Sequence, residues 1–197
     1  MFKHYVFASL LAACIVLGVW LGFTGVITDN SATTPYPGLG GDFTLHSPQN
    51  NPVSLHDFAG QVVLIYFGYT HCPDVCIAAL GKIARAIDSL PEKQRAQVQP
   101  LFISLDPERD SPEKLAAYGR NFHPQIISLT GTPDQVQTIA QGYFIASQKV
   151  PEGTDGAYRV DHSSAIYVLN RAGEVFQLVH QSETAEDLAI VLLNALR

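Results

Sequence analysis

The stretch that decides the fold is QVVLIYFGYTHCPDVC, residues 61–76. From Val62 to Phe67 every residue is apolar or aromatic, and β-branched types are frequent. An uninterrupted run of this kind is typical of a strand that is buried on both faces. The chain then reaches Cys72 and Cys76, and a helical pattern follows. The segment therefore predicts a strand that leads, through a loop with two cysteines, into a helix.

The rest of the chain continues this alternation of strands and helices. Ser111 and Thr132 are each followed by proline, a combination typical of a helix start. Residues 145–160 contain PEGTDG, which indicates a loop or hairpin excursion. The alternation predicts an α/β sheet covered on both sides, with ligands at the carboxyl ends of strands, where the cysteines lie. The predicted elements are a hairpin (42–45 and 52–55), strands over 61–68, 98–105, 126–129, 165–169 and 175–179, and helices over 74–90, 111–122, 132–140 and 184–196.

The composition excludes several classes of protein. The chain has 197 residues, enough for one domain and an appendage, and a formal net charge of -6. A nucleic-acid-binding protein would normally carry a basic patch, so we expect no nucleic-acid partner. Three cysteines, Cys14, Cys72 and Cys76, are too few for a disulfide-rich scaffold or a four-cysteine zinc site.

The N-terminus carries 23 residues without a charged side chain, Tyr5 to Ile27. About 20 apolar residues span a bilayer, so residues 1–27 are predicted to form a single transmembrane anchor. Lys3 precedes the span and Asp29 follows it, which places the N-terminus in the cytoplasm and exports the rest. We expect a bacterial inner-membrane protein whose C-terminal domain faces the periplasm. A cleaved signal peptide and a lipoprotein cleaved before Cys14 are the alternatives.

The anchor is followed by two further parts. Residues 28–40 are small and polar and end in PYPGLG, which is typical of a linker. Residues 41–197 contain all the strands and helices that are predicted beyond the linker, and this part of the chain is predicted to form the globular domain.

The two cysteines suit either redox exchange or soft-metal binding. If the helix begins near Cys72, then Cys72 and Cys76, four residues apart, lie on the same helical face. A helix N-terminus lowers the pKa of a thiol, and the thiolate is both a nucleophile and a metal ligand. A static disulfide is the third possibility, although a bridge that closes so short a loop stabilises a fold little.

A metal site needs at least one more donor, and His162 is the candidate. It lies in VDHSSAIYVLN, just before a predicted buried strand and 86 residues after Cys76. In a sheet of this type that segment can come beside the cysteine loop. Two thiolates and one imidazole would form a soft, three-coordinate site.

Three segments resemble the Sco/SenC family of copper proteins that assemble cytochrome c oxidase. They are YFGYTHCPDVC at 66–76, SLDPERDSPEKL at 104–115 and VDHSSAIYVLN at 160–170. The resemblance implies a thioredoxin-like fold with an N-terminal β-hairpin in which Cys72, Cys76 and His162 bind copper, as Cu(I), Cu(II) or both. The family usually has proline directly after the second cysteine, and here that residue is Ile77.

The function that the resemblance implies is a copper metallochaperone for the dinuclear copper site of an oxidase subunit, and therefore a carrier and not an enzyme. A periplasmic thiol reductant and a copper donor would be further partners, since export pushes a cysteine pair toward the disulfide. The alternative is an enzyme, a thiol–disulfide oxidoreductase that reduces the cysteines of an oxidase subunit. A thiol peroxidase, with His71 as the cationic neighbour, ranks last. Asp161 is expected to cap its loop or to orient His162, and DPERD at 106–110 to fix a loop.

Overall fold

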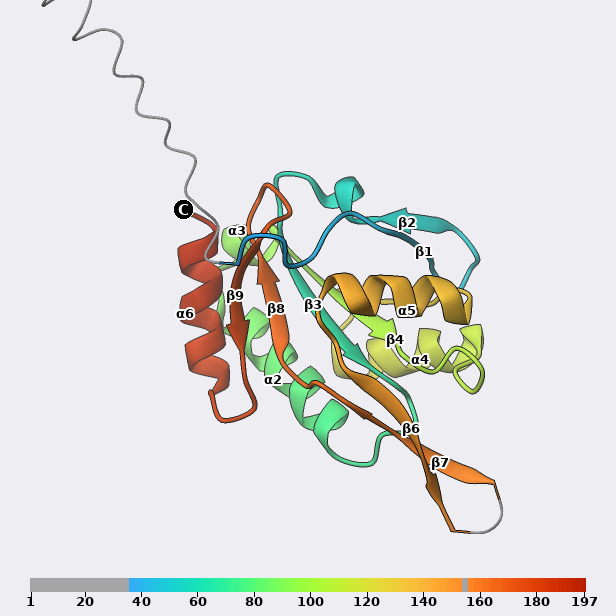
Figure 1. Ribbon diagram of the computed structural model, residues 1–197. Helices are drawn as coiled ribbons and strands as arrows, with labels where there is room; N and C mark the ends of the chain where they lie inside the picture. The colour runs from blue at the N-terminus through green and yellow to red at the C-terminus, as the bar shows by residue number, and fades with distance from the viewer. Residues whose placement is uncertain (1–35, 154–155) are drawn as a thin grey trace, which may run out of the picture. The chain divides into compact units, whose positions relative to one another are not determined.

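The computed structural model describes residues 36–153 and 156–197 (Figure 1). The chain divides into two units, residues 1–33 and 34–197, and the account below concerns the second. The predicted anchor and most of the predicted linker lie outside the described residues. Within the described part, no helix is long and apolar enough to cross a membrane.

The core of the domain is a five-stranded sheet built around the strand that the opening segment predicts. The strand order is β5-β4-β3-β8-β9, in which β5, β4 and β3 are parallel and β8 and β9 are antiparallel to their neighbours. All seven residues of β3 are buried, as predicted. The strands are β3 (Val62–Gly68), β4 (Val98–Ser104), β5 (Ile127–Leu129), β8 (Ile166–Leu169) and β9 (Val175–Val179).

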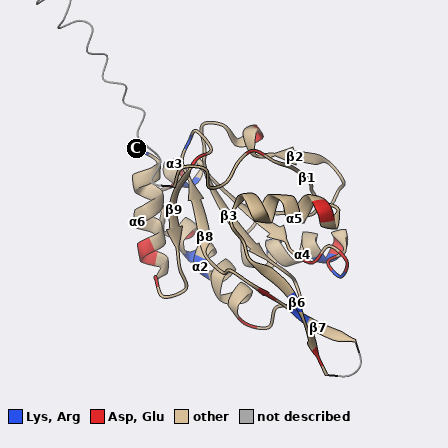
Figure 2. Cartoon of the chain, viewed as in Figure 1, with Lys and Arg blue, Asp and Glu red and all other residues tan. Residues whose placement is uncertain are grey.

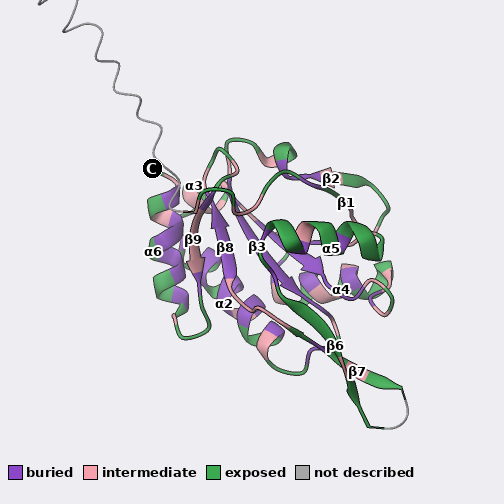
Figure 3. Cartoon of the chain, in the orientation of Figure 1, coloured by how far each residue is buried: buried purple, intermediate pink, exposed green. Residues whose placement is uncertain are grey.

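Helices cover both faces of the sheet, which confirms the predicted layering (Figure 1). Helix α5 lies in front of the sheet in that view, and α2, packed on α6, lies behind it with α4. Buried positions follow the helix sides that face the sheet (Figure 3). The hydroxyls of Ser111 and Thr132 cap α4 and α5, as their sequences predict. The helices are α2 (Val75–Ser89), α3 (Glu92–Arg95), α4 (Pro112–Phe122), α5 (Pro133–Gly142) and α6 (Ala185–Ala195).

The structure differs from the sequence prediction in two small details, at the end of the N-terminal hairpin and in one short helix. The N-terminal hairpin is present, as β1 (Thr44–His46) and β2 (Pro52–Ser54), but Leu55 begins a short 3-10 helix (Leu55–Phe58) instead of ending a strand. Ser54 and Asp57 form a capping box that starts this helix. The four-residue helix α3 was not predicted, because Pro91 ends the preceding pattern and a single turn has no periodicity to detect.

The excursion over residues 145–160 is a two-stranded hairpin, β6 (Ser147–Glu152) and β7 (Ala157–His162). Its strands pair with each other and with no strand of the central sheet, and Figure 1 shows it projecting from the body of the domain. Strand β7 ends on His162, so the third candidate donor lies at the base of a projecting hairpin.

Candidate metal centre

Cys76 lies in the first turn of α2, with its sulfur against the backbone of β3. The side chain is fully buried. A Cβ atom added to Gly68 would lie 2.9 Å from the Sγ atom of Cys76 and 3.0 Å from the ring of Phe102. Gly68, the last residue of β3, therefore leaves the space that the sulfur occupies. Sequence analysis missed this role, because the contact is between a strand end and a helix.

Cys72 reaches the site from the loop and not from the helix. Helix α2 begins at Val75, so the condition under which both cysteines would share a helical face, a helix start near Cys72, is not met. The loop turns before the helix, where the backbone N–H of Cys72 donates to the carbonyl of Tyr69. Both cysteines are free thiols in the structure. Ile77, which stands where the family usually has proline, is 48% exposed, and the helix still begins within two residues of it.

His162 completes a cluster of three donor atoms. Its Nε2 atom lies 3.7 Å from the Sγ atom of Cys76, although 86 residues separate them in sequence. The ligand atoms of Cys72, Cys76 and His162 all lie within 4.8 Å of one another. The predicted proximity of the histidine segment to the cysteine loop is thus confirmed.

The hydrogen bonds of His162 fix which ring nitrogen is free to act as a ligand. Nδ1 lies 2.8 Å from the carbonyl oxygen of Ser163, which only accepts, so Nδ1 carries the proton. Nε2 then presents a lone pair toward the cysteines. Burial lowers the pKa of His162, which favours the neutral imidazole that a metal requires. The rings of Tyr66 and Tyr69 stand edge-on to the imidazole, at 6.3 and 6.0 Å.

The environment of Cys76 differs from the one expected at a helix N-terminus. Burial raises the pKa of its thiol to about 12, with the neighbouring Cys72 contributing in the same direction. The expectation of a lowered pKa is therefore wrong for Cys76, because the loss of solvent outweighs the hydrogen bonds of Tyr69 and Tyr66, which lower the pKa. In the metal-free site, burial thus favours the protonated thiol of Cys76 and the neutral imidazole of His162.

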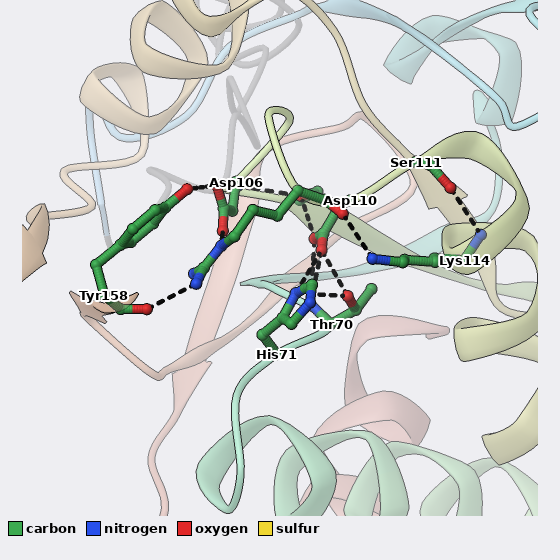
Figure 4. Close-up of polar contacts among 9 residues, drawn as sticks. Thr70, His71, Asp106, Asp110, Ser111, Lys114 and Tyr158 are labelled. Carbon is green, nitrogen blue, oxygen red and sulfur yellow. Dashed lines mark hydrogen bonds and ion pairs between the residues drawn. The ribbon is translucent and has the colours of Figure 1, made fainter. Parts of the chain in front are cut away.

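A buried carboxylate holds the loop that precedes Cys72 (Figure 4). Asp110 accepts hydrogen bonds from the backbone N–H of Thr70 at 3.1 Å and from its hydroxyl at 2.5 Å. A third bond comes from the Ser104 hydroxyl at the end of β4, and His71 lies 3.6 Å away. DPERD does fix a loop, as expected, and that loop is tied directly to the segment leading to Cys72.

Asp161, by contrast, neither orients His162 nor caps the loop. Its carboxylate pairs with Arg159, with an Nε–Oδ1 distance of 2.7 Å, on the solvent side of β7. Successive strand residues point to opposite faces, so the outward Asp161 adjoins the inward His162 without bonding to it. Charges of both signs lie along the hairpin (Figure 2). A surface pocket over the site is lined by Tyr69, Cys72, Pro73, Asp74, Val75, Arg159, Val160, Asp161 and His162.

The fold and the donor cluster together define a thioredoxin-like protein with a soft-metal site. The family model SCO1/SenC matches residues 31–197, and the chain belongs to this family. "Protein SCO2 homolog, mitochondrial" from Mus musculus is 41% identical over 149 residues, 75% of this chain and 58% of that protein. The chain thus spans little more than half the length of the curated relatives it matches.

Two solved structures of relatives contain copper. Arabidopsis thaliana ScoI with copper bound is 33% identical, with a TM-score of 0.75, and the match covers 81% of this chain and 98% of that one. Bradyrhizobium japonicum ScoI with copper bound is 34% identical, with a TM-score of 0.73, and the match covers 80% and 99% of the two chains. The family resemblance and the thioredoxin-like fold predicted from the sequence are confirmed.

Proposed function

We propose that this chain is a membrane-tethered copper metallochaperone that delivers copper to the dinuclear copper site of cytochrome c oxidase. The observation that carries the proposal is the convergence of Cys72, Cys76 and His162 within 4.8 Å. Two sulfurs favour Cu(I), and trigonal sites with cysteine and imidazole ligands are also known for Cu(II). The copper-bound structures of two relatives at 33–34% identity support copper as the cargo.

The site is better suited to passing copper on than to keeping it. Cys72 is 7% exposed and, with His162, lines the surface pocket, whereas Cys76 is fully buried. Three donors leave room for an incoming ligand, and a thiolate of the recipient can enter while the surface-facing donors leave. The buried Cys76 would release the metal last. A structural zinc site, which normally has four protein ligands, fits this donor set poorly.

The second candidate function is thiol–disulfide exchange with the cysteines of an oxidase subunit. Two thiols in one loop of a thioredoxin-like fold favour it, and the pair lies close enough to approach a disulfide with modest movement. Exchange would begin at Cys72, since the thiol of Cys76 is buried and its pKa is raised. The two activities are compatible, because only the reduced pair binds copper.

The remaining parts of the proposal rest on the sequence. A span over residues 1–27 would hold the protein in the bacterial inner membrane, and a linker over 28–40 would give the periplasmic domain reach. Tethering would raise the effective concentration of the domain near a membrane-bound oxidase. An exported pair also requires a thiol reductant and a copper donor in the same compartment.

Transfer to an oxidase subunit tests the proposal directly. The copper-loaded full-length protein is mixed with the metal-free, reduced copper-binding domain of that subunit, and the copper content of each is measured after separation. The proposal predicts transfer, and Cys76→Ser should reduce it sharply, because a protein that has lost one of its two thiolates holds copper weakly. In a parallel experiment the recipient is supplied in its oxidised form, and reduction of its cysteines without any copper transfer in either experiment would favour the oxidoreductase instead.

A further inference from the structure

The hairpin that carries His162 is held to the domain by a cluster that sequence analysis did not assign to the site. Strands β6 and β7 make no backbone pairing with the central sheet in the described part of the chain. Alternation along β7 turns Tyr158, Val160 and His162 toward the domain, while Arg159 and Asp161 are exposed. The position of His162 therefore depends on what Tyr158 and Val160 contact.

Tyr158 is bound through both its side chain and its backbone. Its hydroxyl donates to Oδ1 of Asp106 at 2.8 Å, and its carbonyl accepts from Nη1 of Arg109 at 2.7 Å (Figure 4). The Asp106 side chain is fully buried, and its other oxygen accepts from Nε of Arg109. A buried carboxylate is stable only when it is paired and hydrogen-bonded, and both oxygens of Asp106 are bonded within this set of three residues, whereas Nη2 of Arg109 is buried without a hydrogen-bond partner.

The cation of Arg109 extends this set to the ring that touches the histidine. The guanidinium carbon lies 3.5 Å from the ring centroid of Tyr158 and 5.8 Å from that of Tyr69. Tyr69 in turn stands edge-on to the imidazole of His162, with centroids 6.0 Å apart. Arg109 thus lies between the tyrosine of the hairpin and the tyrosine of the cysteine loop, which are the two segments that must meet for the donors to converge.

We propose that Asp106, Arg109 and Tyr158 are positioning residues that hold the imidazole of His162 close to the thiols of Cys72 and Cys76. The inference rests on the proposed copper function and adds a specific consequence to it. We call these three residues the clamp. Loss of the clamp would free the hairpin, and with it the imidazole of His162, while both thiols keep their positions. Because imidazole matters more for Cu(II) and thiolates alone can hold Cu(I), the clamp governs Cu(II) binding selectively.

The test compares Arg109→Gln with Lys149→Gln in the purified full-length protein in detergent. Both variants lose one positive charge on or beside the hairpin. Lys149, however, pairs with the exposed Glu108 at 2.7 Å and meets the clamp through a cation–π contact, 4.9 Å from its ammonium nitrogen to the ring centroid of Tyr158, which contributes little at an exposed site. Arg109→Gln should weaken Cu(II) binding about 10–100-fold, as loss of residues behind metal ligands typically does, and leave Cu(I) affinity within about twofold. Lys149→Gln should leave both affinities unchanged.

Two further measurements separate positioning from a general loss of stability. In a His162→Ala background, Arg109→Gln should add no further loss of Cu(II) affinity, since the group that it positions is gone. In the metal-free protein, the ring nitrogen resonances of His162 should show increased motion in Arg109→Gln and in the milder Tyr158→Phe. The second readout needs no copper, so it stands even if the copper function is wrong.

Three outcomes would overturn the clamp. One is unchanged Cu(II) affinity in Arg109→Gln. Another is an equal loss of Cu(I) and Cu(II) affinity, which would mean general damage to the fold. The third is an additive loss in the double variant. A wild-type protein that binds no copper, but whose His162 resonances respond as described, would contradict the proposed function and leave the clamp supported.

Discussion

The Nε2 atom of His162 lies 3.7 Å from the Sγ atom of Cys76, and the ring proton on Nδ1 is held by the carbonyl of Ser163. The imidazole therefore points its lone pair at a buried thiol. Such an arrangement favours a metal over a simple disulfide exchange site, because the histidine is presented as a ligand and burial disfavours its cationic form.

Replacing His162 with alanine should separate the two oxidation states of copper. Cu(II) affinity should fall at least about tenfold and its absorption spectrum should change, while most Cu(I) affinity remains on the two thiolates. Competition titrations with calibrated chelators measure both affinities. His180→Ala is the matched control, since His180 is exposed and lies at the end of β9, outside the donor cluster. An unaltered Cu(II) spectrum and affinity in His162→Ala would rule the imidazole out as a ligand.

A methyl group at position 68 should disturb the site from the sheet side. In Gly68→Ala the new Cβ would meet the Sγ atom of Cys76 at 2.9 Å, so overpacking should lower the free energy of unfolding by about 1–3 kcal/mol and weaken copper binding. Gly81→Ala is the control within α2. Its nearest neighbour is the flexible end of Arg85 at 3.4 Å, and alanine in a helix should be neutral or stabilise by up to about 1 kcal/mol. Denaturant unfolding of the two variants gives the comparison, and equal stabilities would contradict the packing argument.

Copper binding should strengthen as the pH rises. Burial raises the pKa of Cys76 to about 12, so at neutral pH this thiol is protonated and copper must displace the proton. Below that pKa each displaced proton raises the apparent affinity about tenfold per pH unit. Cu(I) competition titrations between pH 6 and 8 measure this effect. Affinity should rise less steeply with pH in Cys76→Ser, because that variant has one thiol proton fewer to displace. A pH-independent affinity in the wild-type protein would mean that Cys76 is already a thiolate or is not a ligand.

The elements of this fold were predictable where the local pattern is strong. The apolar run of β3 and the capped starts at Ser111 and Thr132 are local signals, and each produced the expected element. The approach of His162 to the cysteines also followed, since the order of strands brings the segment before β8 to the end of β3.

Properties that depend on several distant segments were not predictable. The raised pKa of Cys76 comes from burial under β3 and its neighbours, which no feature of the CPDVC segment indicates. Likewise, the contacts of Asp110 with Thr70 span 40 residues, and that of Asp106 with Tyr158 spans 52. Such polar pairs carry no periodicity, so the motif DPERD indicated a fixed loop but not the partners that it fixes.

The location of the protein is a separate prediction from its uncharged N-terminal span. The full-length chain should pellet with membranes, and protease added to spheroplasts should remove the domain, because Lys3 keeps the short N-terminus inside. A cytoplasmic protein followed in the same samples shows whether the inner membrane is intact. A full-length chain that is freely soluble, or protected until the membrane is dissolved, would contradict the orientation.

The most direct test of the account is the copper stoichiometry of the reduced and oxidised protein. Three donors and no second cysteine pair in the described domain predict one copper per reduced chain. Oxidation to a Cys72–Cys76 disulfide should abolish binding, since disulfide sulfur is a poor ligand, and a thiol reductant should restore it. Metal analysis after gel filtration gives both numbers. One copper when reduced and none when oxidised is the predicted result, and normal binding by the oxidised protein would contradict the three-donor site.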